Sequence, residues 1–86
     1  MYKLVFHKRV KKQTDELKSE KSVYTKLLSL YEVLEKDPFE PPYEKLVGDL
    51  DGFYSRRINI KHRLVYEVDI ADKTVYVTSV RKHYEF

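Results

Sequence analysis

The sequence predicts an α+β fold, in which an N-terminal strand is followed by two helices packed on one face of an antiparallel sheet. Three observations lead to this prediction. Residues 22–36 carry apolar side chains at helical spacing, which is typical of a helix that buries one side. Residues 53–59 and 62–68 are two runs of strand-forming residues whose short separation requires a hairpin. Residues 74–80 repeat the strand pattern after a second turn.

The size and composition of the chain limit its organisation. We take residues 1–86 as a single domain, because this length supports one hydrophobic core and not two. There is no cysteine, and the three histidines lack metal-ligand spacing, so we predict neither a metal nor a cofactor. No apolar run approaches the roughly 18 residues that cross a membrane, and the N-terminus does not resemble a signal peptide. We therefore expect a soluble, cytoplasmic protein with no membrane contact.

Charge and aromatic content indicate possible partners. The chain has 17 Lys and Arg against 14 Asp and Glu, a net charge of +3. This mild basic excess is compatible with a polyanionic or acidic partner, although many ordinary domains share it. The eight tyrosines and four phenylalanines are more informative. Tyrosine combines stacking area with a polar tip, which suits nucleotide binding and also suits packing at the edge of a core.

The N-terminal part of the chain predicts a short strand over residues 2–6 and a first helix over residues 7–20. Four basic residues crowd the start of this helix: Lys8, Arg9, Lys11 and Lys12. Cations in a first helical turn oppose the helix dipole, so they do not serve helix stability. Two interpretations stay open, a solvated helix face or a patch that follows a phosphate backbone.

The second helix is predicted from Ser22, which can cap its N-terminus, to Lys36. Its core stripe consists of Val23, Leu27, Leu30 and Leu34. Pro38 ends the helix, because the residue before a proline is pushed out of helical geometry. Residues 37–43, hereafter the connector, contain three prolines. This stiff connector delivers Glu44 to a defined place.

The register of the hairpin decides where its arginines point. A two-residue turn pairs Arg57 with Leu64 and drives an arginine into the core, which is costly unless the charge is paired. A three-residue turn places Arg56 on the face of Leu64 and Arg57 beside Arg63. Neither register is clean, but the second buries more apolar surface. It leaves Arg57 and Arg63 on the sheet face that the helices do not cover, and that face is where we expect function.

The last strand completes the predicted sheet. If Asp69 pairs with Thr74, then Val75 and Val77 join the core face of the hairpin. Residues 81–86 follow as a short tail. The sheet would then be an antiparallel meander with one buried and one open face.

Four residues are candidates for chemistry: Glu44 after the connector, Arg63 in the sheet centre, and His83 with Tyr84 in the tail. A carboxylate, a histidine and an arginine around one cleft suit metal-free cleavage of RNA. The base removes the 2′-hydroxyl proton, the acid protonates the departing 5′-oxygen, and the guanidinium stabilises charge on the phosphoryl oxygens. No short motif fixes this trio, and each member has an ordinary explanation. The ordinary explanation is a solvated loop acid for Glu44, an ion pair with Glu67 for Arg63, and a polar residue of a frayed terminus for His83.

Three blocks of sequence resemble the YoeB/Txe family of toxin–antitoxin systems. They are GFYSRRI at residues 52–58, HRLVYEV at residues 62–68 and the pair HY at residues 83–84. The blocks come in the family's order and near its spacing, and PFE at residues 38–40 resembles its loop. The resemblance is strong over residues 38–84 and weak before them.

The resemblance implies a compact microbial-ribonuclease-like fold of the RelE superfamily. It also implies a ribosome-dependent mRNA endonuclease, or mRNA interferase, that inhibits translation by cutting message in the ribosomal A site. The implied partners are the 70S ribosome with its A-site mRNA and an acidic YefM-like antitoxin. A homodimer is left open by the sequence.

Carried over position by position, the resemblance implies four catalytic roles: general base for Glu44, phosphate stabilisation for Arg63, general acid for His83 and substrate positioning for Tyr84. The RNA-binding residues expected beside them are Arg57, Arg56, Lys45 and Tyr54. The first helix departs from the better-known members because it is rich in lysine. Tyr54 stands where the family usually has tryptophan, and Lys45 where it often has proline. Glu85 and Phe86 extend the chain beyond the HY pair.

Two other interpretations remain. One is a non-enzymatic inhibitor of DNA gyrase resembling ParE, which shares the superfamily fold. Glu44 and the HY pair argue against it, because a pure binder has no need of an acid and a base. The other is an RNA-binding module without chemistry, which the lysine-rich first helix and the tyrosines permit.

Overall fold

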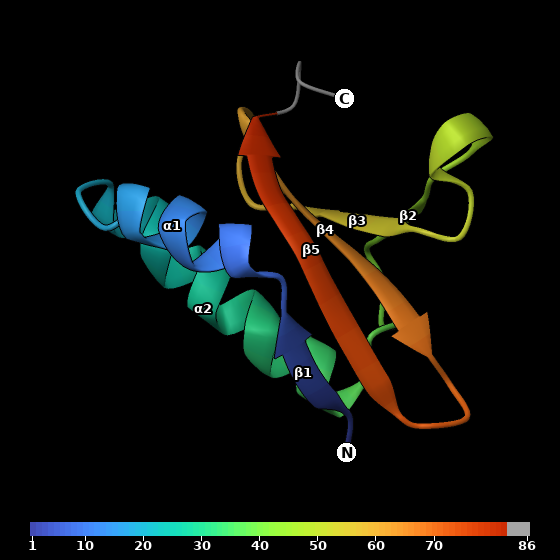
Figure 1. Ribbon diagram of the computed structural model, residues 1–86. Coiled ribbons are helices and arrows are strands. Elements are labelled where there is room, and N and C mark those ends of the chain that lie inside the picture. Colours follow the sequence, from blue (N-terminus) through green and yellow to red (C-terminus); the bar gives the residue numbers. More distant parts are fainter. Residues whose placement is uncertain (83–86) are drawn as a thin grey trace.

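The structure is a computed structural model that describes residues 1–82, and it contains one sheet with the strand order β1-β5-β4-β3-β2 (Figure 1). The elements in chain order are β1 (Lys3–Phe6), α1 (Lys8–Glu16), α2 (Lys21–Lys36), β2 (Glu44–Lys45), the 3-10 helix η1 (Gly48–Leu50), β3 (Tyr54–Arg57), β4 (His62–Asp69) and β5 (Thr74–Lys82). Both helices lie on one side of the sheet (Figure 1). The predicted α+β fold is therefore confirmed.

The sheet is mixed, whereas the sequence predicted an antiparallel sheet. β1 runs parallel to β5, with Lys3 opposite Thr74 and Phe6 opposite Val77, whereas the strands from β2 to β5 are antiparallel. No hairpin joins β1 to its neighbour, so nothing in the local sequence imposes an antiparallel direction. The β4–β5 pairing starts in the predicted register, with Asp69 opposite Thr74, and a β-bulge at Thr78 shifts it by one residue in the second half of β5.

α1 is shorter than the predicted range of residues 7–20. His7 precedes it in an extended conformation, and its Nδ1 accepts a hydrogen bond from the backbone N–H of Arg9 at 3.1 Å. The ring thus satisfies one of the N–H groups that a helix start leaves without an intrahelical partner. Later in α1, Oε1 of Gln13 accepts the backbone N–H of Val80 at 2.7 Å. α1 therefore binds the part of β5 that extends past β1.

The start of α2 differs from the prediction. The predicted cap, Ser22, lies inside the helix, which begins at Lys21, and Glu20 precedes it without a side-chain capping bond. A tight turn comes directly before this start, with the N–H of Glu20 donating to the carbonyl of Leu17 at 2.9 Å. Because of this turn α2 begins at Lys21, whereas the sequence pattern predicted Ser22 as the residue that caps the helix. The predicted C-terminal end at Lys36 is correct.

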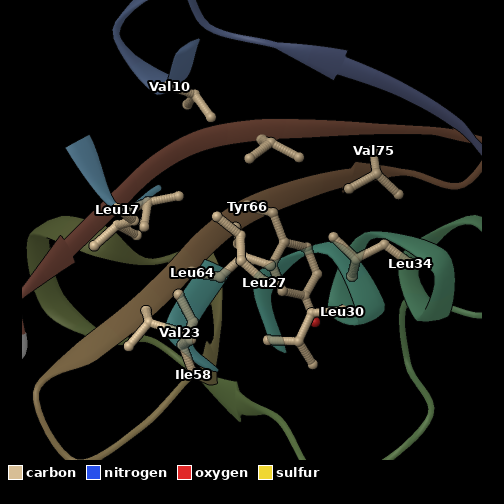
Figure 2. Close-up of a cluster of buried hydrophobic side chains, with 12 residues drawn as sticks. Val10, Leu17, Val23, Leu27, Leu30, Leu34, Ile58, Leu64, Tyr66 and Val75 are labelled. Atoms are coloured by element: carbon tan, nitrogen blue, oxygen red, sulfur yellow. The ribbon is translucent and has the colours of Figure 1, made fainter. Parts of the chain in front are cut away.

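The core lies between α2 and the sheet. The buried residues of α2 are the predicted stripe of Val23, Leu27, Leu30 and Leu34. Across from them, Leu64 and Tyr66 of β4 and Val75 and Val77 of β5 are fully buried. Figure 2 shows the labelled members of this cluster gathered around Tyr66. Within residues 1–82, no helix has the length and apolar character to cross a membrane.

The β3–β4 hairpin has the predicted three-residue turn. The N–H of Ile58 donates to the carbonyl of His62 at 2.9 Å, and Arg57 lies opposite Arg63. Oδ1 of Asn59 accepts the N–H of His62 at 2.7 Å, which ties the turn back on itself. This register places Ile58 in the core and both arginines on the other face.

Candidate active site

Three arginines form a row on the sheet face that the helices leave uncovered. Arg57 of β3 lies opposite Arg63 of β4, and Arg63 lies opposite Arg81 of β5. Neighbouring strands are about 4.8 Å apart, and like charges directly opposite one another destabilise a sheet. This arginine row therefore indicates a site suited to an anion.

Glu44 lies beside the arginine row through the pairing of β2 with β3. Its partner in the register is Ser55, and Nη1 of Arg63 donates to Oε1 of Glu44 at 2.9 Å and to Oγ of Ser55 at 3.2 Å. The side chain of Arg63 is 7% exposed, whereas that of Glu44 is 60% exposed. The guanidinium is thus fixed within the sheet, and the carboxylate faces solvent where a ligand can reach it.

The connector that carries Glu44 is anchored to buried groups on the helix side of the sheet. The hydroxyl of Tyr66 donates to the carbonyl of Pro38 at 2.9 Å, and the guanidinium of Arg56 donates to the carbonyls of Pro38 and Pro42. Burial raises the pKa of Tyr66 to about 12. The hydroxyl therefore keeps its proton at neutral pH and remains a donor to the connector.

Aromatic rings pack around the same anchor. Tyr54 makes edge contacts with Phe39 and Tyr43 of the connector, at centroid distances of 5.3 and 5.8 Å. It also stacks on Tyr66 at 5.8 Å. These rings lie on the helix side of β3 and β4, on the face opposite the arginine row, and their packing helps to hold the connector in place.

The structure separates the predicted RNA-binding residues. Arg57 is exposed and shares the face of Arg63. Arg56 and Tyr54 lie on the opposite face of β3, where Arg56 is buried and Tyr54 is half-buried. Lys45 is exposed on β2 and lies opposite Tyr54 in the register.

The predicted general acid His83 and the positioning aromatic Tyr84 lie outside the described residues. Arg81, two positions before His83 in the sequence, is described and was not predicted as a site residue. Its Nε donates to Oγ of Ser79 at 3.1 Å, and its register partner is Arg63. The prediction ended this strand at residue 80, and regular alternation from the predicted core residues Val75 and Val77 would have put residue 81 on the core face. A β-bulge at Thr78 reverses the alternation, because Tyr66 lies opposite Val77 and Val65 opposite Ser79, and it places Arg81 beside Arg63.

A pocket of about 360 Å³ opens beside Glu44, where β3 extends past the short strand β2. Ser55 and Arg57 of β3 line it together with Leu30 and Val33 of α2. Its volume falls in the range of small-ligand sites, roughly 300–1,000 Å³. Among residues 1–82, no group of three or more His, Asp and Glu side chains converges to hold a metal ion.

Known toxins are similar to the chain in sequence and in structure. The Toxin YoeB of Synechocystis sp. (strain ATCC 27184 / PCC 6803 / Kazusa) is 38% identical over 69 residues, which are 78% of each chain. A solved YoeB/ParE toxin from Agrobacterium tumefaciens has 29% identity and a TM-score of 0.84, covering 95% of this chain and 99% of that one. A chain of the YoeB-YefM complex from Staphylococcus aureus has 30% identity and a TM-score of 0.79, with 98% and 99% covered.

A chain of the archaeal RelE-RelB complex from Pyrococcus horikoshii OT3 also matches, with 27% identity and a TM-score of 0.79 over 94% of this chain and 93% of that one, so the predicted RelE-like fold is confirmed. The family model of the YoeB-like toxin matches residues 8–84. The sequence-based resemblance, strong over residues 38–84, is confirmed with it. The chain therefore belongs to the YoeB-like toxins of bacterial type II toxin-antitoxin systems.

Proposed function

We propose that this toxin is a ribosome-dependent mRNA endonuclease that cleaves message in the ribosomal A site through attack by the 2′-hydroxyl. One observation carries the proposal: the carboxylate of Glu44 and the guanidinium of Arg63 lie 2.9 Å apart within a row of arginines. A base and a phosphate-stabilising cation are the groups that this reaction needs. Binding gyrase or RNA without chemistry requires no general base, so the exposed carboxylate of Glu44 favours the endonuclease.

In the proposed reaction Glu44 removes the proton of the 2′-hydroxyl. The 2′-oxygen forms a bond to phosphorus while the bond from phosphorus to the 5′-oxygen breaks, and His83 gives its proton to that leaving oxygen. The products are a 2′,3′-cyclic phosphate and a 5′-hydroxyl. One proton enters Glu44 and one leaves His83, so the step balances without a metal or cofactor.

Arg63 supplies the electrostatic part of catalysis. Its guanidinium is nearly buried and is held by Ser55, so it is already oriented when the phosphate arrives. The planar fork of N–H groups matches two phosphoryl oxygens at once. The entering phosphate takes over N–H groups of Arg63 and leaves Glu44 free to accept the 2′-hydroxyl proton.

The remaining predicted residues take supporting roles. Arg57 and Arg81 flank Arg63 and attract the neighbouring phosphates of the message. Lys45 adds an exposed cation beside Glu44, and Tyr84 positions the substrate base. The burial of Arg56 and the packing of Tyr54 favour a role in holding the site for these two residues.

The proposed partners follow from the site and the relatives. The Staphylococcus aureus relatives include a complex with YefM and a YoeB dimer. We propose an acidic YefM-like antitoxin whose carboxylates cover the arginine row and exclude RNA, and a homodimer as the free form. The 70S ribosome with its A-site mRNA is the proposed target, which places the activity in the cytoplasm.

Inducing the chain alone in a bacterium, and mapping the 5′ ends of messages, tests the proposal. We expect growth arrest with new message ends inside translated codons, and we expect co-expression of the cognate antitoxin to restore growth. Glu44→Gln should abolish both the arrest and the new ends. Growth arrest with intact messages and a defect in DNA supercoiling would instead indicate a gyrase inhibitor, and arrest with neither change an RNA-binding module.

A further inference from the structure

Arg56 is a buried cation on the side of β3 that faces the helices, away from the arginine row. Its side chain is almost inaccessible, at 3% residue exposure, and its register partner is the core residue Leu64. No ion pair links it to a carboxylate within residues 1–82. Burying a guanidinium in this way is costly unless all its N–H groups find partners. The hydrogen-bond partners of the Arg56 guanidinium therefore indicate its role.

Those partners are the two ends of the connector. Nη2 of Arg56 donates to the carbonyl of Pro38 at 2.8 Å, and Nη1 donates to the carbonyl of Pro42 at 3.1 Å. Nε donates at 3.1 Å to the hydroxyl of Tyr66, which itself donates to the carbonyl of Pro38. The guanidinium carbon also lies 5.7 and 5.8 Å from the ring centroids of Tyr43 and Tyr66. One planar group thus bridges both ends of the connector.

Besides these bonds, the connector is held by ring packing against Tyr54 and by local hydrogen bonds at its first residues. Prolines have no N–H, so this segment cannot be fixed by a regular ladder of backbone hydrogen bonds. β2, which follows it, has only two residues, and Glu44 is the first of them. Glu44 is paired with Ser55, and Arg56 is the next residue of the same strand. Ser55 therefore pairs with the strand that carries Glu44, and Arg56, the next residue of β3, holds the connector that precedes that strand.

We propose that Arg56 is a positioning residue for Glu44, fixing the carboxylate through the carbonyls of Pro38 and Pro42. The inference rests on the proposed role of Glu44 as the base. A misplacement of about 1 Å can lower a rate by about a hundredfold, so the hold on the connector matters for catalysis. Lysine cannot replace Arg56, because one ammonium cannot span two carbonyls in the geometry of a planar fork.

A double-mutant cycle tests this role by single-turnover cleavage on ribosomes carrying a defined message. The four proteins are the wild type, Arg56→Met, Glu44→Gln and the double variant. Arg56→Met should slow the wild type by about tenfold or more, and should slow Glu44→Gln by less than about threefold, because the base that Arg56 positions is already absent. Equal slowing in both backgrounds would overturn the proposal, as would full activity of Arg56→Met.

The same cycle keeps the two hypotheses apart. Slow cleavage by Glu44→Gln with unchanged cleavage by Arg56→Met would overturn the role of Arg56 and leave the proposed function in place. Undiminished cleavage by Glu44→Gln would overturn the role of Glu44 as the base and the role of Arg56 with it, whereas absence of cleavage by the wild type would overturn the proposed function itself. Should Arg56→Met fail to fold, Tyr66→Phe serves in the cycle, because it removes the hydroxyl that contacts both Arg56 and Pro38.

Hydrogen exchange gives a readout that does not depend on activity. We expect the amides of Glu44 and Leu46, which point toward β3, to exchange at least about tenfold faster in Arg56→Met and in Arg56→Lys than in the wild type. The matched control is Val10→Ala, which removes buried methyl groups under α1 and leaves the connector intact. This control should lower stability without accelerating exchange at Glu44 or slowing cleavage. Unchanged exchange at Glu44 in both Arg56 variants would overturn the proposal.

Discussion

His83→Gln is expected to slow single-turnover cleavage on programmed ribosomes by about a hundredfold or more. Glutamine keeps some hydrogen bonding but has no proton to give to the departing 5′-oxygen. A histidine is suited to this task, because the unperturbed pKa of an imidazole is about 6.5 and the ring exchanges protons readily at neutral pH. A message with sulfur at the 5′-leaving position should restore most of the lost rate, because a thiolate leaves without protonation.

Glu44→Gln is the matched comparison for that experiment. It removes the proposed base, so it should be slow with the oxygen and with the sulfur leaving group alike. The structure supports this assignment through the exposed carboxylate, which lies within 2.9 Å of Arg63. Equal rescue of both variants by sulfur, or undiminished cleavage by either one, would contradict this division of roles.

Arg63→Lys is expected to be nearly as damaging, with a loss of about a hundredfold in the cleavage step. The ammonium keeps the charge but lacks the planar pair of N–H groups with which a guanidinium contacts two phosphoryl oxygens in parallel. Because the charge remains, association with the ribosome should change by no more than about threefold. A slow cleavage step with near-normal association is therefore the expected pattern. Cleavage within about threefold of the wild type would show that the two-pronged contact is not needed.

The sequence alone predicts the parts of the fold that local patterns determine. The stripe of α2 gives the helix side of the core, and the choice of the register that buries more apolar surface places Arg57 beside Arg63. The parallel pairing of β1 with β5 was missed, because the two strands come from opposite ends of the chain and no turn relates them. The start of α2 was missed because the preceding turn, and not a capping side chain, sets it.

The candidate site is less accessible from sequence. Glu44 and Arg63 are 19 residues apart, and before the structure showed their contact they were linked only by the chemistry of their side chains and by the resemblance to the toxin family. Arg56 was expected to bind RNA because it belongs to the same block as Arg57. Its guanidinium donates to the backbone carbonyls of Pro38 and Pro42. Every residue has a backbone carbonyl, so the sequence does not show which carbonyls accept such bonds. Arg81 was missed because the predicted strand ended two residues too early and because the bulge at Thr78, which turns Arg81 to the open face, was not predicted.

The chemistry of the cut ends tests the central claim most directly. We would add the toxin to ribosomes carrying a defined message, in parallel with a message that has a single 2′-deoxynucleotide at the cleavage position. The account predicts a 5′-hydroxyl and a 2′,3′-cyclic phosphate or 3′-phosphate from the first message and no cleavage of the second. Chelators that remove transition metals but spare ribosomal magnesium should leave the rate unchanged. A 3′-hydroxyl product, or undiminished cleavage of the 2′-deoxy message, would contradict the account, because the 2′-oxygen would then not be the nucleophile.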